Sequence, residues 1–213
     1  MKTGGRVLLA DDHPLTREGL ALAARSALPG IATIGVGSVA EAVAIAEETR
    51  TEFRMILLDL QLPDARGFSG LLALQFRQPH VPIVVVTARE DQSLVEAARA
   101  LGAAGFLFKS LPLDTIAARL REIDAGRTCF PDGTTANPLV EAARARIGGL
   151  SPAQHKVLLA LADARSNKQI ARDLNVTEAT IKAHLSAIFR TLGVSNRAQA
   201  LLAIQPLIGS VGT

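Results

Sequence analysis

The first half of the chain alternates between short apolar runs and longer segments in which apolar residues recur every three or four positions. Five apolar runs are rich in β-branched residues and have the length of buried strands: 6–10, 31–36, 55–60, 82–87 and 105–108. Five amphipathic segments rich in Ala and Leu alternate with them: 15–27, 39–48, 67–76, 93–101 and 113–125. This alternation predicts an α/β fold with a doubly wound, five-stranded parallel sheet.

The pattern changes after residue 125. Residues 126–138 are rich in Gly, Pro, Thr and Asn, and residues 126–148 are predicted to form a linker with one short helix at about 139–146. From residue 149 onward the segments are helical: about 151–163, 167–174, 178–192 and 195–204. The sequence therefore predicts an α/β domain at 1–125 and a small all-α, four-helix domain at 149–213.

Start signals support the helices of the second domain. Ser151 and Gln154 have the spacing of a capping box. Thr177 is expected to cap the third helix and Ser195 the fourth. Residues 205–213 contain Pro and Gly and are expected to form a loose tail.

Composition excludes several classes of protein. Of the 213 residues, 48% are hydrophobic, which argues against disorder. No apolar run reaches the roughly 18 residues of a membrane span, and the first strand begins too early for a signal peptide. Cys129 is the single cysteine, so we expect no disulfide and a reduced, cytoplasmic setting. Aromatic residues are 3%, without Trp or Tyr, which disfavours recognition of RNA or single strands by base stacking.

The net charge of +3 conceals a difference between the two domains. Residues 1–125 contain 13 Lys and Arg against 15 Asp and Glu, whereas residues 149–213 contain 7 against 3. A basic C-terminal domain beside an acidic N-terminal one favours a polyanionic partner for the former.

Polar residues stand where four of the predicted strands end. Asp11 and Asp12 follow the first strand, Asp59 the apolar run of the third, Thr87 ends the fourth, and Lys109 follows the fifth. Each has an ordinary explanation when taken alone, such as a helix cap, a turn or a solvated lysine. Because the carboxyl ends of parallel strands meet at one edge of the sheet, their joint placement favours a single site.

The chemistry of this group suits phosphoryl transfer with a divalent cation. Carboxylate oxygens are the ligands that Mg²⁺ prefers, and Asp11, Asp12 and Asp59 are the candidates. The ion would screen their mutual repulsion and leave one oxygen of Asp59 as a nucleophile that can form an acyl phosphate. Lys109 and Thr87 can then contact phosphoryl oxygens.

The strings DDHPLTREGL, LLDLQLPD, VVVTA and GFLFKS resemble the motifs of the response-regulator receiver domain, over about residues 5–125. The resemblance implies a flavodoxin-like fold and transfer of a phosphoryl group from a phosphohistidine of a sensor histidine kinase, with Mg²⁺. It makes Asp59 the phosphoacceptor and Asp11 and Asp12 the acidic metal-binding pair. It assigns to Gln61 the backbone carbonyl that completes the metal ligands.

The same resemblance gives roles to three further positions. Thr87 supplies the hydroxyl that moves toward the phosphoryl group, and Lys109 is the ion-pair partner of that group. Phe106 occupies the position of a rotating aromatic ring, which is expected to turn inward when Thr87 moves. The family often has Met where Leu62 stands, a change of similar volume.

The second and third helices of the C-terminal domain are separated by a turn short enough for a helix-turn-helix. The third helix has an apolar stripe suited to a core: Ile181, Leu185, Ile188 and Phe189. Lys182, Ser186 and Arg190 recur on another side with Ala183 beside them, and Lys168 lies near the start of the preceding helix. Small and basic residues on an outer helix face fit the major groove of double-stranded DNA and its phosphates. A plain helical bundle with ordinary surface charges is the alternative.

The segment from LSPAQHKV to NRAQAL resembles the LuxR-type helix-turn-helix domain over about residues 149–204. Together with the receiver motifs, it resembles the NarL/FixJ subfamily of response regulators. The resemblance implies that Lys182, Ala183 and Ser186 lie on the recognition face and that the last helix serves dimerisation. It assigns contacts with the DNA backbone to three residues: Lys168, Thr180 and Arg190. The family usually has Glu where Gln154 stands; Gln keeps the capping box but forms no ion pair.

These features predict a two-component response regulator that regulates transcription, dimerises when active and catalyses only its own phosphorylation and dephosphorylation. One alternative is a phosphatase of the haloacid-dehalogenase type, which requires a second Asp where Gln61 stands. Another is a receiver that acts only as a passive dimerisation platform. The linker allows two arrangements: domains docked with the recognition helix covered, or domains loosely tethered.

Overall fold

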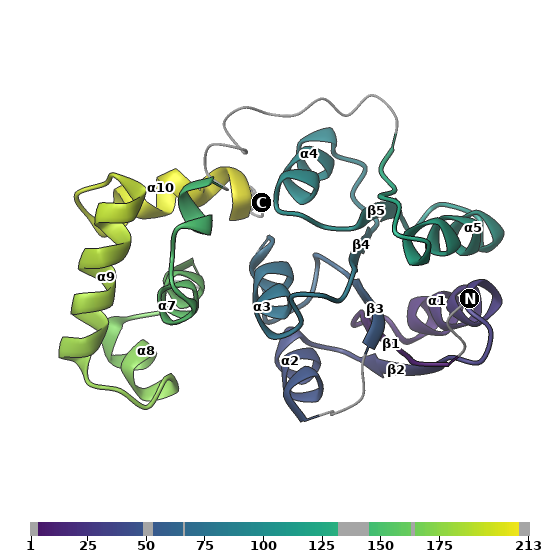
Figure 1. Ribbon diagram of the computed structural model, residues 1–213, viewed down its shortest axis with the longest axis horizontal. Coiled ribbons are helices and arrows are strands. Elements are labelled where there is room, and N and C mark those ends of the chain that lie inside the picture. Colours follow the sequence, from purple (N-terminus) through teal and green to yellow (C-terminus); the bar gives the residue numbers. More distant parts are fainter. Residues whose placement is uncertain (1–3, 49–52, 66, 132–144, 163–164, 209–213) are drawn as a thin grey trace.

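The computed structural model describes most of the chain: residues 4–48, 53–65, 67–131, 145–162 and 165–208. They form an α/β domain and a helical domain (Figure 1). Most of the helix expected at 139–146 and the end of the expected tail lie outside the described residues. Within the described parts, no helix is both long enough and apolar enough to span a lipid bilayer.

Five parallel strands form the sheet, in the order β2-β1-β3-β4-β5. Their bounds are β1 Arg6–Ala10, β2 Ala32–Val36, β3 Phe53–Leu58, β4 Ile83–Thr87 and β5 Gly105–Phe108. Every residue of β4 is buried, and β1 and β3 are nearly so, which explains why these strands appear as continuous apolar runs. The predicted doubly wound sheet is confirmed.

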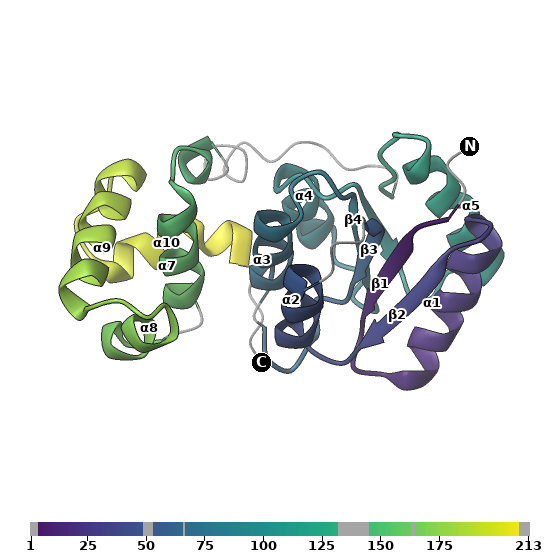
Figure 2. The same ribbon diagram turned by 60° about the horizontal axis from the view of Figure 1, so that its bottom comes forward.

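Helices cover both faces of the sheet (Figure 2). On one face α1 (Pro14–Ala27) and α5 (Leu113–Asp124) pack against each other and against the strands. The other face is covered by α2 (Val39–Glu48), α3 (Ser69–Arg77) and α4 (Gln92–Ala100). The sheet is thus the middle of three layers, with β2 as a partly exposed edge strand.

The helical domain contains α7 (Pro152–Ala162), α8 (Asn167–Asp173), α9 (Glu178–Leu192) and α10 (Arg197–Ile208). The expected caps of α7 and α9 are confirmed. The N–H of Ser151 donates to Gln154 Oε1 (2.8 Å) and the N–H of Gln154 to Ser151 Oγ (3.4 Å), while the N–H of Thr180 donates to Thr177 Oγ1 (3.1 Å).

Two expectations about the last helix were wrong. Asn196, not Ser195, caps α10: its Oδ1 accepts the N–H of Gln199 at 2.9 Å, whereas the N–H of Ser195 donates to the Gln199 side chain. The helix also continues past Ile204 and through Pro206 to Ile208. A proline in a helix interior usually interrupts it, so the sequence alone favoured an earlier end.

The first residues of the expected linker pack on the α/β domain. Cys129 is buried and forms an isolated bridge with Gly105 of β5. The N–H of Phe106 donates to the Cys129 carbonyl (2.8 Å), and the N–H of Cys129 donates to the Ala104 carbonyl (3.1 Å). The guanidinium of Arg99 lies 4.2 Å from the ring centre of Phe130. Residues 127–130 therefore extend the α/β domain along the edge of β5.

The two domains are in contact. α7 packs against α3, and α10 reaches α4 (Figure 2). The Phe76 ring of α3 lies near two cations, with the Arg77 guanidinium 5.3 Å and the Lys156 ammonium 5.4 Å from its centre. Helix α9 lies on the side of its domain that is farthest from the sheet (Figure 1).

Candidate functional site

Hydrogen bonds between neighbouring strands bring the polar strand-end residues to one place. The N–H of Asp59 donates to the carbonyl of Ala10 (2.8 Å), so the first residues after β3 and β1 are side by side. The N–H of Lys109 donates to the carbonyl of Thr87 (2.9 Å), which aligns the ends of β5 and β4. The structure therefore brings together the strand-end residues that the sequence placed in one site.

Lys109 joins the two most deeply buried carboxylates. Its Nζ lies 2.6 Å from Asp11 Oδ2 and 2.7 Å from Asp59 Oδ2, and each carboxylate side chain is 1% exposed. Burial lowers the pKa of Lys109, but its hydrogen bonds and charge interactions with Asp11 and Asp59 together raise that pKa above its ordinary value. One ammonium faces two carboxylates, so the pocket keeps a net negative charge.

The pocket has the donor set of a divalent cation site. Ligand atoms from Asp11, Asp12, His13 and Asp59 all lie within 4.8 Å of one another. Asp11 Oδ2 is buried and, among the described residues, takes part in no hydrogen bond of ordinary geometry, although the Lys109 ammonium is 2.6 Å away. Clustered carboxylate oxygens that neutral donors do not satisfy fit Mg²⁺, so the residues present suit the expected ion.

Among the remaining expected residues, Gln61 contacts Asp59 directly, and Thr87 and Phe106 are buried. The Thr87 side chain is buried, and its Oγ1 accepts the N–H of Arg89 at 3.3 Å. The N–H of Gln61 donates to Asp59 Oδ1 at 3.1 Å. Phe106 is fully buried and packs edge-on against Phe108, with ring centres 5.7 Å apart. In this structure the Phe106 ring lies in the interior, and its expected rotation stays a prediction.

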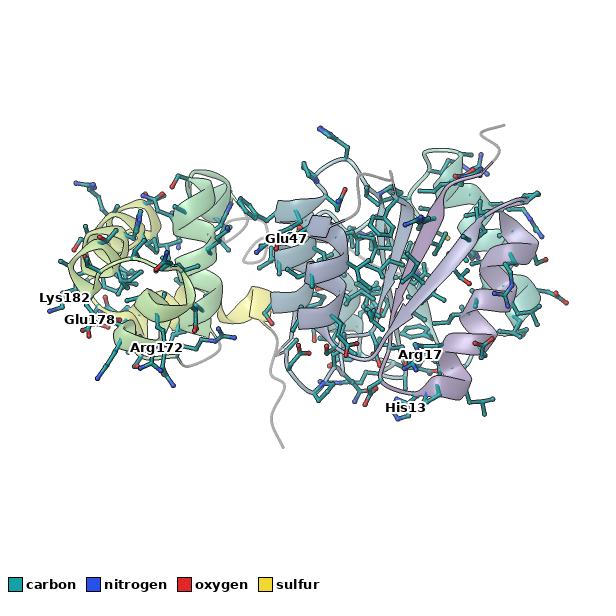
Figure 3. The ribbon with its side chains drawn as sticks, turned by 90° about the horizontal axis from the view of Figure 1, so that it is seen from below. His13, Arg17, Glu47, Arg172, Glu178 and Lys182 are labelled. Carbon is teal, nitrogen blue, oxygen red and sulfur yellow. The ribbon has the colours of Figure 1, made fainter. Side chains whose placement is uncertain are left out.

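Three polar residues make contacts that were not expected from the sequence. His13 Nδ1 lies 2.7 Å from Asp12 Oδ1, and the Arg17 guanidinium donates to the Asp11 carbonyl at 2.6 Å (Figure 3). Arg17 lies one helical turn after His13, a spacing that places both residues at the same end of the sheet. Asp64 accepts the N–H groups of Val39 and Ala40 at the start of α2, a contact between distant segments that no local pattern signals.

The outer face of α9 carries the residues expected to meet DNA. Three residues of the expected apolar stripe are buried: Ile181, Leu185 and Ile188. The fourth, Phe189, is only partly buried, and Leu192 is buried in addition. Lys182, Ala183, Ser186 and Arg190 are exposed, and Figure 3 shows Lys182 on the outside of its domain, away from the sheet.

Local hydrogen bonds engage some of these side chains. Ser186 Oγ donates to the Lys182 carbonyl at 3.0 Å, and Thr180 Oγ1 lies 2.9 Å from Thr177 Oγ1 within the cap of α9. Lys168 is exposed at the start of α8. The observed arrangement differs from both of those expected, because the domains touch and yet the recognition face is uncovered.

The sequence matches two protein families. Residues 7–121 match the family described as "Response regulator receiver domain", and residues 149–204 match "Bacterial regulatory proteins, luxR family". The glycerol metabolism activator of Pseudomonas putida is 33% identical over 207 residues, which cover 92% of this chain and 93% of that protein. The nitrate/nitrite response regulator NarL of Escherichia coli is 30% identical over 203 residues, covering 91% and 92%.

Solved structures of the RcsB response regulator have the same architecture. One, from Salmonella typhimurium, has a TM-score of 0.55 at 19% identity and covers 95% of this chain and 99% of that one. Another, of two RcsB dimers bound to two parallel DNAs, has a TM-score of 0.54 at 22% identity and covers 95% and 98%. At these identities the likeness concerns the fold, and the sequence matches identify the family. The chain belongs to the NarL/FixJ-type response regulators, transcriptional regulators that join a receiver domain to a LuxR-type DNA-binding domain.

Proposed function

We propose that Asp59 accepts a phosphoryl group from a sensor histidine kinase and that this modification controls the binding of the C-terminal domain to double-stranded DNA. The observation that carries the proposal is the arrangement of Asp11, Asp59 and Lys109 at the carboxyl edge of the sheet, beside a cluster suited to a divalent cation. The family match and the Gln at position 61 argue against a haloacid-dehalogenase-type phosphatase.

The residues of the pocket divide the work of phosphoryl transfer. An Asp59 oxygen attacks the phosphorus of the phosphohistidine, a P–O bond forms as the P–N bond breaks, and the electron pair stays on the histidine nitrogen. Asp11, Asp12 and Asp59, with the Gln61 carbonyl, would hold Mg²⁺, which supplies charge neutralisation for the transferred group. Lys109 contacts a phosphoryl oxygen, and the chain acts only on its own aspartate rather than on an external substrate.

The assignment of Asp59 is tested by its amide. Asp59→Asn keeps the shape of the side chain but removes the nucleophilic carboxylate, so we expect no stable modification by acetyl phosphate and Mg²⁺. Intact-mass measurement after incubation reports the added phosphoryl group. Asp114→Asn, which changes an exposed carboxylate in the first turn of α5, should be modified like the unaltered chain. Modification of Asp59→Asn to the wild-type extent would refute the assignment.

The Lys109 ion pairs are expected to stabilise the fold in a pH-dependent way. Lys109→Gln leaves two buried carboxylates without their cation and should lower the free energy of unfolding by roughly 3–5 kcal/mol in the absence of divalent ions. Because the folded state raises the pKa of Lys109 above 10.5, its contribution is complete below that value and is lost as the pH rises through the raised pKa.

Urea unfolding between about pH 7 and pH 11 measures this difference. Lys182→Gln, at an exposed lysine, is the matched control and should change stability little. A wild-type-like free energy of unfolding for Lys109→Gln at neutral pH would contradict the structural role of the two ion pairs.

We infer that the outer face of α9 enters the major groove of DNA. The exposed Lys182, Ala183 and Ser186 present a small, basic surface, with Arg190 one turn further on. Such a face allows close approach to base edges while cations meet the phosphates. The active form is proposed to be a homodimer working in the cytoplasm, with Lys168 and Thr180 as further contacts to the DNA backbone.

Lys182 provides the direct test of this face. Lys182→Ala should weaken binding to a duplex selected from random sequences by roughly 1–3 kcal/mol and relax the base preference at one position if Lys182 contacts a base. Fluorescence anisotropy at two salt concentrations separates this outcome from the loss of a phosphate contact. Such a loss weakens binding about equally for all sequences and makes the affinity less dependent on salt. Arg119→Ala, at an exposed arginine of α5, is the control. Unchanged affinity for Lys182→Ala would remove α9 as the recognition element.

The uncovered face of α9 bears on how the receiver controls DNA binding. The contact between domains involves α3 with α7 and α4 with α10, and none of the exposed α9 residues named above is buried by it. We therefore propose that control acts on the pairing of two copies rather than on access of one copy to a single half-site.

Loosening the contact between domains tests this proposal. Phe76→Ala removes the ring beside Lys156 without changing the charge of either domain. In the unphosphorylated chain, affinity for one half-site should change by less than about threefold, because the recognition face is already free. Leu22→Ala, at an exposed residue of α1, is the control. A rise of about tenfold or more for Phe76→Ala alone would mean that docking covers the DNA-binding face.

A further inference from the structure

His13 is a polar residue of the pocket to which the proposed phosphoryl transfer gives no task. It stands between Asp12 and Pro14 at the start of α1, with an extended backbone and no capping hydrogen bond from its side chain. Its N–H donates to Asp11 Oδ1 at 2.8 Å. This bond fixes the position of His13, and the imidazole lies at the mouth of the pocket with 66% of the side chain exposed (Figure 3).

The imidazole is close enough to the carboxylates to share a cation with them. His13 Nδ1 lies 2.7 Å from Asp12 Oδ1 and 3.5 Å from Asp11 Oδ1, and all ligand atoms of the cluster lie within 4.8 Å of one another. In a six-coordinate ion with bonds of about 2.1 Å, neighbouring ligand atoms are about 3 Å apart and opposite ones about 4.2 Å. The two His13 separations are close to those of neighbouring ligands, whereas the 4.8 Å span of the cluster is slightly longer than the distance between opposite ligands. A small inward movement of the side chains would therefore bring all four atoms onto one ion.

Lys109 and His13 approach different oxygens of Asp11. The ammonium of Lys109 lies on Oδ2, whereas the imidazole and the backbone N–H of His13 lie on Oδ1. The Lys109 ammonium therefore does not occupy the side of Asp11 that faces Asp12 and His13, and a cation can approach Asp11 from that side. An ion on that side would meet carboxylate oxygens from three residues and one imidazole nitrogen.

We propose that His13 is a ligand of the cation site, and that this chain therefore binds divalent transition metals such as Mn²⁺, Co²⁺ and Zn²⁺ more tightly than an all-oxygen pocket would. Mg²⁺ prefers oxygen ligands and gains little from a nitrogen, whereas imidazole is a good ligand for the later first-row metals. The inference rests on the cation site of the proposed function but not on transfer of a phosphoryl group, so it stands or falls independently of Asp59 phosphorylation.

The test compares two metals on the full, untagged chain. Titration calorimetry with Co²⁺ and with Mg²⁺ is carried out on the wild type, on His13→Asn and on His80→Asn, which changes an exposed histidine at the opposite edge of the sheet. For His13→Asn we expect Co²⁺ affinity to fall about tenfold or more, while Mg²⁺ affinity changes by less than about threefold. The visible absorption of bound Co²⁺ should also change, and His80→Asn should match the wild type.

Other results would overturn the proposal. An equal loss of affinity for both metals in His13→Asn would show that the imidazole acts only through its hydrogen bond to Asp12. No loss for either metal would make His13 an ordinary surface histidine. Asp12→Ala tests where the ion binds, because this change should strongly lower the affinity for both metals. Co²⁺ binding that survives Asp12→Ala would place the metal elsewhere on the chain.

Discussion

The ammonium of Lys109 between the carboxylates of Asp11 and Asp59 is the interaction on which the rest of the pocket depends. Both carboxylate side chains are almost completely removed from water, and two buried like charges without a counter-charge would oppose folding by several kcal/mol. One lysine compensates one of the two charges. The remaining negative charge suits the divalent cation proposed for this pocket, so the interaction that allows the site to fold also leaves it able to bind a cation.

The order of the strands produces this arrangement. β1 lies directly beside β3, which places the residues after Ala10 and Leu58 next to each other, and β4 pairs with β5 so that Thr87 lies opposite Phe108. Apolar residues fill both sides of the sheet and leave few positions for polar groups except at its edges. The residues of the pocket are therefore brought together by the converging ends of four ordinary strands, without a dedicated loop.

Most of the fold and the pocket could be predicted because both depend on local patterns: continuous apolar runs, helical periodicity and polar residues at strand ends. The features that could not be predicted depend on tertiary contacts or on a choice between similar neighbours. Ser195 and Asn196 are both residues that cap helices well, and the sequence alone does not show that Asn196 accepts the N–H of Gln199. The packing of Cys129 on β5 and the contact of Asp64 with α2 join distant segments, and the docking of α7 on α3 leaves no periodic signal.

Asp64 lies on the loop that follows Asp59 and reaches the boundary between the two domains. It follows Asp59 by five residues on the same loop, and its carboxylate fixes the first turn of α2 through two backbone hydrogen bonds of 2.9 and 2.8 Å. The same residue lines a cavity at the domain boundary, together with Lys156 of α7 and Asp173 of α8. The loop that follows Asp59 is therefore in contact both with α2 and with the cavity between the two domains. The residues of α9 that are expected to contact DNA lie outside this boundary and are already exposed, which agrees with the proposal that control acts on the pairing of two copies.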